Sequence, residues 1–230
     1  MRALTPKAAI AAVLIAVASP ASAAVITHSA AIPSDQTDFS TTVSVPKFDP
    51  TLGTLLSVAF TLFGEVTGDL GVENRNRSNA VAVTSRLEAT LTLFRPDGTT
   101  LVVTVPNQVF TDSLARYDRT LDFGGTSGRT HAGIDASSSN SFASSLPFDL
   151  ALFTGSGSIV LPMTANGTSS YDGTSNISFQ ADSDANGLVT VAYTYRAAAV
   201  PEPMALSLFG VGLAGLGVAA HRRRRRRGGA

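Results

Sequence analysis

Alternation of apolar and polar residues at every second position is the feature that most limits how this chain can fold. In residues 87–94, leucine and alanine alternate with glutamate and threonine. In residues 188–196, valine and tyrosine alternate with threonine and alanine. Period two is typical of a strand with one buried face and one solvated face. Because antiparallel sheets commonly expose one face to water, these segments predict antiparallel strands.

Similar patterns predict further short strands along the chain. They cover residues 25–31, 41–45, 55–63, 67–73, 80–84, 100–105, 108–114, 119–123, 157–161, 164–170 and 176–180. The sequence Arg95-Pro96-Asp97-Gly98 has the residue types of a tight turn and predicts a hairpin between 87–94 and 100–105. Residues 124–128 and 135–145, rich in glycine and serine, predict a mobile loop and a flexible connector. The fold class we expect is all-β, an antiparallel β-sandwich of jelly-roll or immunoglobulin-like type.

The two ends of the chain differ from this interior. Arg2 and Lys7 precede an apolar run at 8–18, and the small residues Ala21 and Ala23 follow it. This order predicts a secretory signal peptide over residues 1–23, cut after Ala23. The extracellular β-sandwich domain is then expected over residues 24–199.

A second apolar run, residues 204–220, has no charged residue, and as a helix it would be about 26 Å long, near the lower limit for a membrane span. A basic cluster follows at 221–227. It consists of His221, Arg222, Arg223, Arg224, Arg225, Arg226 and Arg227. Because basic residues beside a span stay in the cytoplasm, this tail predicts a single transmembrane helix with the rest of the chain outside.

The residues just before the predicted span carry a family resemblance. Val200, Pro201, Glu202 and Pro203, followed by the apolar run and the arginines, resemble the PEP-CTERM sorting signal of Gram-negative, exopolysaccharide-producing bacteria. The resemblance covers residues 200–227. It implies recognition by a membrane-embedded exosortase, which removes the tail and releases or re-anchors the domain at the cell surface or in the extracellular matrix.

Charge and composition limit the chemistry of the expected domain. Residues 24–200 contain nine basic and sixteen acidic residues, a net charge of −7, which argues against nucleic acid and other polyanions as partners. Cysteine is absent, so neither disulfides nor a thiol nucleophile is possible. Histidine occurs in the domain only at His28 and His131, which gives little support to a histidine-based metal site or hydrolase triad.

One short segment has metal-binding character. Asp182, Asp184 and Asn186 place oxygen ligands at alternate positions before a glycine, as in the opening of a calcium-binding EF-hand loop. The twelfth position of such a loop would be Tyr193, which lies in a predicted strand and cannot supply the bidentate acid. The competing and favoured interpretation is a hairpin turn at Asn186-Gly187 that joins 176–180 to 188–196.

Three internal segments carry a second resemblance. Residues 45–55, 123–128 and 149–157 are similar to landmarks of the choice-of-anchor E domain, found in secreted bacterial proteins with various surface-anchoring tails. The resemblance implies an extracellular β-rich module and supplies no active-site residues. The residues around Phe48-Asp49-Pro50 also predict, on physical grounds, a rigid turn that leads into a core strand.

These observations leave three classes of function. The first is a non-enzymatic surface or matrix protein, linked to exopolysaccharide or biofilm, without a cofactor. The second is a carbohydrate-binding or adhesive module, with calcium as a possible aid. The third is a polysaccharide-acting hydrolase that works with paired carboxylates, whose spacing a sequence does not show.

Overall fold

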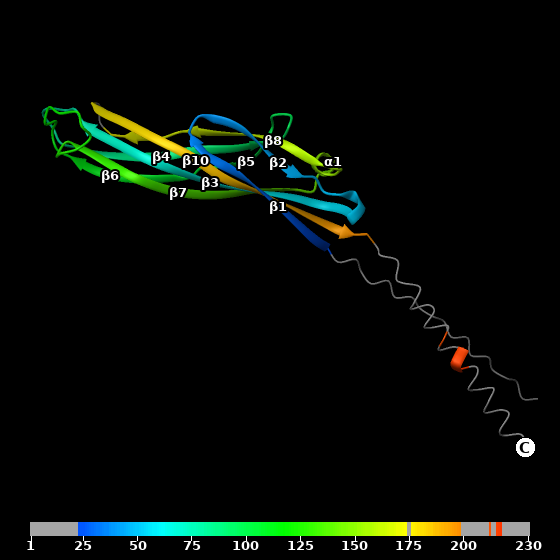
Figure 1. Ribbon diagram of the computed structural model, residues 1–230. Coiled ribbons are helices and arrows are strands. Elements are labelled where there is room, and N and C mark those ends of the chain that lie inside the picture. Colours follow the sequence, from blue (N-terminus) through cyan, green and yellow to red (C-terminus); the bar gives the residue numbers. More distant parts are fainter. Residues whose placement is uncertain (1–22, 174–175, 199–211, 213–214, 218–230) are drawn as a thin grey trace, which may run out of the picture.

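The computed structural model describes residues 23–173, 176–198, 212 and 215–217, and its strands form two antiparallel sheets (Figure 1). The first sheet has the order β1 (Ala23–Gln36), β10 (Ile177–Ala197), β3 (Gly53–Asn74) and β7 (Gly128–Ser144). The second has the order β2 (Phe39–Pro46), β8 (Ser158–Gly167), β4 (Val81–Phe94) and β5 (Thr100–Thr104), with β6 (Asn107–Leu114) and β9 (Ser170–Asp172) also paired to β4. The predicted all-β, antiparallel architecture is confirmed, and it is consistent with a β-sandwich.

Strand β4 organises the second sheet along its whole length. Its first half pairs with β6 on one side and with β9 on the other, and its second half pairs with β5 and β8. Strands β5 and β6 thus succeed one another along the same edge of β4, with Pro106 between them. The Pro106 carbonyl accepts a hydrogen bond from the Ala89 amide at 3.2 Å, so the ladder continues past a residue that has no N–H. The result is an elongated domain of two layers (Figure 1).

The apolar positions of the alternating strands form the core between the layers. Leu87, Leu91 and Leu93 in β4 have no exposed surface, and neither do Val189 and Val191 in β10. Each buried leucine or valine contributes roughly 1.5–3 kcal/mol to folding. The predicted period-two alternation is therefore confirmed in both strands.

The predicted hairpin turn at Asn186-Gly187 is wrong, because β10 runs through it without a break. Gly187 pairs with Gly64 of β3 and with Ile32 of β1, so its backbone lies between two neighbours rather than at a turn. A Cβ atom at Gly187 would lie 2.5 Å from the Phe63 carbonyl oxygen. The glycine allows close packing of strands, which is the other common reason for glycine in a sheet.

Other boundaries also differ from the prediction. Segments expected as pairs of strands are continuous in β3, β4 and β10. The predicted connector 135–145 belongs almost entirely to β7, an edge strand whose small polar residues suit a solvated position. The predicted strand 119–123 is a loop, in which Arg119 and Phe123 have φ angles of +84° and +52°, far from the extended conformation that non-glycine residues adopt in a regular strand.

The predicted hairpin at residues 95–98 is confirmed. The Arg95 amide donates to the Thr99 carbonyl at 2.8 Å, and the Gly98 amide donates to the Arg95 carbonyl at 2.9 Å. Gly98 has a φ of +84°, the left-handed conformation that glycine adopts at little cost. This turn places Arg95 against the short helix α1 (Pro147–Phe153).

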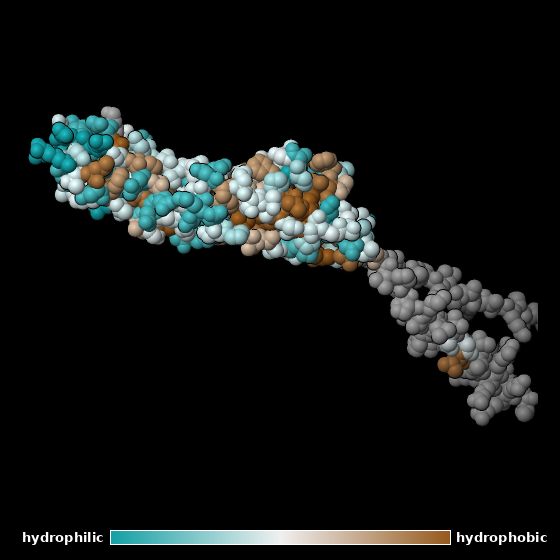
Figure 2. All heavy atoms as spheres, turned by 45° about the horizontal axis from the view of Figure 1, so that its top comes forward, coloured by the Kyte–Doolittle hydropathy of each residue, from teal (hydrophilic) through white to brown (hydrophobic). Residues whose placement is uncertain are grey.

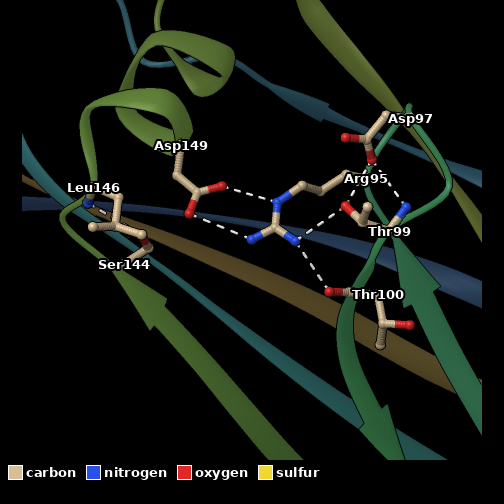
Figure 3. A network of polar contacts seen from close by, with 7 residues as sticks. All are labelled: Arg95, Asp97, Thr99, Thr100, Ser144, Leu146 and Asp149. Carbon is tan, nitrogen blue, oxygen red and sulfur yellow. Dashed lines mark hydrogen bonds and ion pairs between the residues drawn. The ribbon is translucent and has the colours of Figure 1, made fainter.

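Arg95 and Asp149 form a buried ion pair that fastens α1 to the β4–β5 hairpin (Figure 3). The Arg95 Nε and Nη2 atoms donate to the two carboxylate oxygens of Asp149 at 2.9 and 3.3 Å, while Nη1 donates to the Thr100 carbonyl at 3.0 Å. The guanidinium also lies over the Phe142 ring, 5.1 Å from its centroid. The Asp149 side chain is only 2% exposed and that of Arg95 only 13% exposed, so each charge depends on the other for solvation.

This pairing controls the ionisation of Asp149. Burial alone raises the pKa of its carboxyl, but the hydrogen bonds from Arg95 and Ser144 and the charge of Arg95 outweigh burial, so the pKa lies below the ordinary aspartate value. A carboxyl whose pKa is lower in the folded state stabilises that state above its unfolded pKa of about 3.9. The contribution is lost as the pH falls below that value.

We expect Arg95→Gln to lower the free energy of unfolding by about 3–5 kcal/mol at neutral pH, because it leaves the Asp149 carboxylate buried without its cation. The matched control is Arg86→Gln, since Arg86 forms a surface pair with Glu88 at 3.2 Å and its side chain is 46% exposed. This control should cost less than about 1 kcal/mol. Urea unfolding of both variants measures the difference.

The pH dependence of stability shows whether Asp149 stabilises the protein through its charge or only through its packing. Wild-type stability should fall as the pH drops through about 4, and the advantage of wild type over Asp149→Asn should shrink over the same range. An advantage that does not change with pH would show that the Asp149 charge has no role.

Both ends of the described domain lie at one end of the sandwich, which we call the base (Figure 1). Ala23 of β1 pairs with Arg196 of β10, and Ala197 pairs with Gly53 at the start of β3. The opposite end, which we call the tip, contains the loops 75–80 and 115–127. Within the described residues, no helix has both the length and the apolar character needed to cross a membrane.

Candidate functional site

Most residues of the predicted sorting and export signals lie outside the described part of the chain. These are Ala21, the motif 200–203 and the basic cluster 221–227, together with all of the predicted span 204–220 except residues 212 and 215–217. Ala23 is described and is the first residue of β1. Cleavage after Ala23 would therefore leave the rest of β1 in the domain.

The three residues of the calcium hypothesis lie along β10 rather than in a loop. Asp182, Asp184 and Asn186 pair with Asp69, Thr67 and Glu65 of β3. Residues two apart in a strand are roughly 6.6–6.8 Å apart along it, so their ligand atoms do not converge as they do in an EF-hand loop. The sequence pattern therefore has another structural basis here, the solvated face of a strand.

Two of these aspartates do contribute to a groove of about 410 Å³. Asp69 of β3 and Asp135 of β7 join Asp182 and Asp184 in its lining, at an irregularity in the β3–β7 register. Asp69 accepts the Gly133 amide at 2.7 Å, and Asp182 accepts the Gln36 side-chain amide at 3.1 Å. Sequence reasoning missed Asp69 and Asp135 because only the strand register brings them beside Asp182.

The groove concentrates negative charge without a recognisable ligand set. Asp182 lies directly opposite Asp69, and like charges at opposed positions in a sheet destabilise it. In the described ranges, no group of three or more histidine or acidic side chains is disposed to hold a metal ion.

Two of the three segments that resemble the choice-of-anchor E domain, residues 45–55 and 149–157, meet at the base and have structural roles there. Phe48 forms a parallel bridge with Thr154, and its amide donates to the Phe153 carbonyl at 2.9 Å. The Asp49 side chain caps the turn η1 (Pro50–Leu52), after which β3 begins at Gly53. The predicted rigid turn before a core strand is confirmed.

Phe48 also packs against two aromatic residues at the base. It is 2% exposed and lies beside Tyr193 and Tyr195, with ring centroids 6.0 and 5.1 Å away. The Tyr193 hydroxyl donates to the Pro46 carbonyl at 2.7 Å, and burial raises the pKa of this phenol. These contacts account for the landmark residues through packing alone.

The third landmark, residues 123–128, lies at the tip, far from the other two. It is not simply a mobile surface loop, because Ser127 and Gly128 are buried. A Cβ atom at Gly128 would collide with a Glu73 carboxylate oxygen and with the Gly124 amide. The Glu73 carboxylate is fully buried, and neither of its oxygens has a hydrogen-bond partner within the described chain. The glycine-rich segment is therefore packed directly against a buried acidic side chain.

The tip also carries a pocket of about 460 Å³ with basic character. Its lining consists of Arg77, Ala115, Arg116, Tyr117, Asp118, Arg119 and Thr126. Three arginines against one aspartate give the lining a net charge of +2. Figure 2 shows that this end of the molecule, on the left, is predominantly hydrophilic.

Buried Asn74 holds the two loops of the pocket together. Its side-chain amide donates to the carbonyl oxygens of Asn79 and Ala115 at 2.9 and 2.7 Å, and its side-chain oxygen accepts the Asn76 amide at 2.9 Å. The Tyr117 amide then donates to the Asn76 carbonyl at 2.8 Å. The loop segment that carries Arg77 is therefore held beside residues 116–119 by a network whose central residue, Asn74, has no exposed surface. Sequence reasoning missed this pocket because its arginines come from separate loops.

His131 and Asp112 form a further cluster that links the two sheets. The Nε2 atom of His131 lies 2.8 Å from an Asp112 carboxylate oxygen, and Arg129 Nε lies 3.8 Å from the other oxygen. The His131 ring stacks on Phe110 with centroids 3.8 Å apart. Because Asp112 and Phe110 belong to β6 and His131 belongs to β7, these contacts join the edges of the two layers.

We expect calcium at millimolar concentration to leave the melting temperature of the protein unchanged relative to magnesium, because the groove offers aspartates on three extended strands instead of a converging loop. A ligand that binds only the folded state must raise that temperature. Thermal unfolding of wild type and Asp182→Asn, with each ion, tests this. A rise specific to calcium that Asp182→Asn abolishes would restore the calcium site.

Comparison with known proteins adds little to this geometry. No family model matches the chain, and no curated protein matches it at a significant level. Similar solved chains include those of the infectious bursal disease virus Gx and Gt strains, each 16% identical, with TM-scores of 0.21 and 0.20. Another, from the T13 IBDV viral particle, is 14% identical with a TM-score of 0.21. Each covers 76% of this chain and 36% or 37% of the viral chain, so this protein spans little more than a third of their length. At these TM-scores the likeness carries no information about function.

Proposed function

We propose that this chain is an exported bacterial surface or extracellular-matrix protein, sorted and processed by an exosortase, whose folded domain has a non-catalytic structural or interaction role linked to exopolysaccharide or biofilm. The predicted signal peptide and the PEP-CTERM-like tail support export and sorting. The transmembrane helix at 204–220 is part of this proposal and serves as a transient anchor. The domain needs no cofactor for such a role.

The observation that carries the proposal is the position of both ends of the described domain at the base. β1 and β10 are antiparallel neighbours, so Ala24, the first residue after the predicted signal cleavage, lies opposite Tyr195, only a few residues before the predicted sorting tail begins at residue 200. A domain tethered there extends away from the membrane along its long axis. The tip is thus the part best placed to meet other molecules outside the cell.

The strand order favours the jelly roll over the immunoglobulin-like sandwich. If β5 with β6 and β8 with β9 each count as one interrupted strand, the domain has eight strands in two sheets. Numbered in this way, the strands of the first sheet have the order 1-8-3-6 and those of the second sheet have the order 2-7-4-5. This is the arrangement expected of an eight-stranded jelly roll, and it differs from the seven-stranded constant-type immunoglobulin sandwich.

The alternative function, a carbohydrate-binding or adhesive module, is favoured by one observation. The pocket at the tip combines basic residues with Tyr117, a half-buried aromatic residue of the same lining. This alternative is compatible with the main proposal, because a matrix protein that binds polysaccharide has both properties.

Mass and location of the protein in the producing bacterium test export and sorting. In cells with the exosortase, we expect a product lighter than the full chain and outside the inner membrane. In cells without the exosortase, the heavier form should stay in the membrane fraction. The double variant Pro201→Ala with Pro203→Ala should behave in normal cells as wild type does without the exosortase.

Ala199→Ser, just outside the motif, is the matched control and should be processed normally. The same mass and the same membrane fraction for wild type in both strains would contradict the proposal.

A further inference from the structure

We propose that the pocket at the tip binds an acidic saccharide, with Arg77, Arg116 and Arg119 as ligands of its carboxylate groups and Tyr117 as the surface for a sugar ring. This inference deepens the proposed interaction role and rests on it only for its biological setting, because binding is measured on the purified protein.

The two tip loops carry a local excess of positive charge, which the net charge of −7 conceals, because they contain four arginines and only two of the sixteen acidic residues, Asp118 and Asp122. Five of the nine basic residues in residues 24–200 lie at the tip. They are Arg75, Arg77, Arg116, Arg119 and Arg129. Arg129 faces Asp112, but Arg77, Arg116 and Arg119 have no ion pair among the residues that the structure describes. Free guanidinium groups around a hollow attract anions even when the whole domain is acidic.

The pocket is held in shape before any ligand arrives. Asn74 ties the loop that carries Arg77 to the loop that carries Arg116, and the Asp118 amide donates to the Ser127 hydroxyl at 3.3 Å. Arg119 has a φ of +84°, a conformation that costs energy for an arginine and that only its surroundings enforce. The loop backbone that carries the three arginines is therefore ordered, and their exposed guanidinium groups can each bind a carboxylate with two parallel hydrogen bonds.

Three features of the lining favour a saccharide over other anions. Asp118 lies among the arginines, and one of its oxygens accepts the Thr120 amide at 2.8 Å. Its carboxylate suits a ligand that brings hydroxyl donors together with acidic groups, as sugars do and as the backbone of DNA does not. Tyr117 adds an aromatic surface with a polar end, which suits the apolar face and hydroxyl rim of a sugar ring. Ala115 is the sole small apolar residue of the lining, so an acyl chain has little to contact.

Sodium alginate, a polymer of acidic sugars, is the probe, and dextran is its neutral counterpart. The protein used is the full chain in detergent with Arg222–Arg227 all replaced by glutamine, so that the tail cannot bind the polymer. Titration calorimetry should show binding of alginate that weakens as sodium chloride is raised, and no binding of dextran.

The double variant Arg116→Gln with Arg119→Asn should bind alginate at least about tenfold more weakly, because two charge-assisted contacts are lost. Asparagine is chosen at position 119 since it tolerates the left-handed backbone. The control is Arg86→Gln with Arg196→Gln, which removes the same charge from exposed positions outside the tip and should bind within about twofold of wild type. The melting temperature of each variant shows whether it is folded.

Three results would overturn the proposal. The first is absence of alginate binding by the folded wild type, and the second is equal loss of binding in the double variant and its control. The third is binding of single-stranded DNA as tight as that of alginate, which would identify a general polyanion site. None of these results bears on the mass and location of the protein in cells, so failure here is distinguishable from failure of the proposed function.

Discussion

The pairing of β10 with β3 on one side and with β1 on the other is the interaction on which the rest of the structure depends. The ladder with β3 runs from Ile177 opposite Asn74 to Ala197 opposite Gly53. Every residue of so long a strand must direct its backbone groups to a neighbour, since unpaired buried groups are costly. The ladder therefore sets the length of the domain and holds the two ends of the described chain together at the base.

The same constraint determines where chemically interesting side chains gather. Because β3 ends and β7 and β10 begin at the tip, their connections must lie there, and they bring Arg77 close to Arg116 and Arg119. At the base, the packing of Phe48 and the Arg95–Asp149 pair close the opposite end with buried contacts. One end is thus adapted to stability and the other presents unpaired charge. This division agrees with a domain that is tethered at its base and functions through its tip.

The alternating pattern was enough to predict which faces of β4 and β10 are buried, because burial on one face requires period two. It was not enough to predict strand length. Gly98 follows Asp97 and Gly187 follows Asn186, and both dipeptides are typical of turns. Gly98 does lie in a turn, whereas Gly187 lies in a strand that packs closely against its neighbour. Only the partner strands distinguish the two roles, and these are distant in sequence.

The candidate sites were less predictable for a related reason. The aspartates of β10 were visible in sequence, but Asp69 and Asp135 join them through register. The tip pocket could not be predicted from the net charge of the whole domain, because that sum does not show which arginines two separate loops bring together. Composition excludes a type of site reliably where the required residue is absent, as cysteine is. It is less informative about binding sites that depend on the position of each charge.

A distance along β10 tests this account most directly. The chain has no cysteine, so Gln180→Cys and Arg196→Cys, both at exposed positions, would carry the only two spin labels. A continuous strand rises roughly 3.3 Å per residue, and pulsed electron paramagnetic resonance should then report about 50 Å between the labels. A hairpin at Asn186-Gly187 would bring the labels within about 20 Å and would contradict the long central strand, the shared base and the exposed tip together.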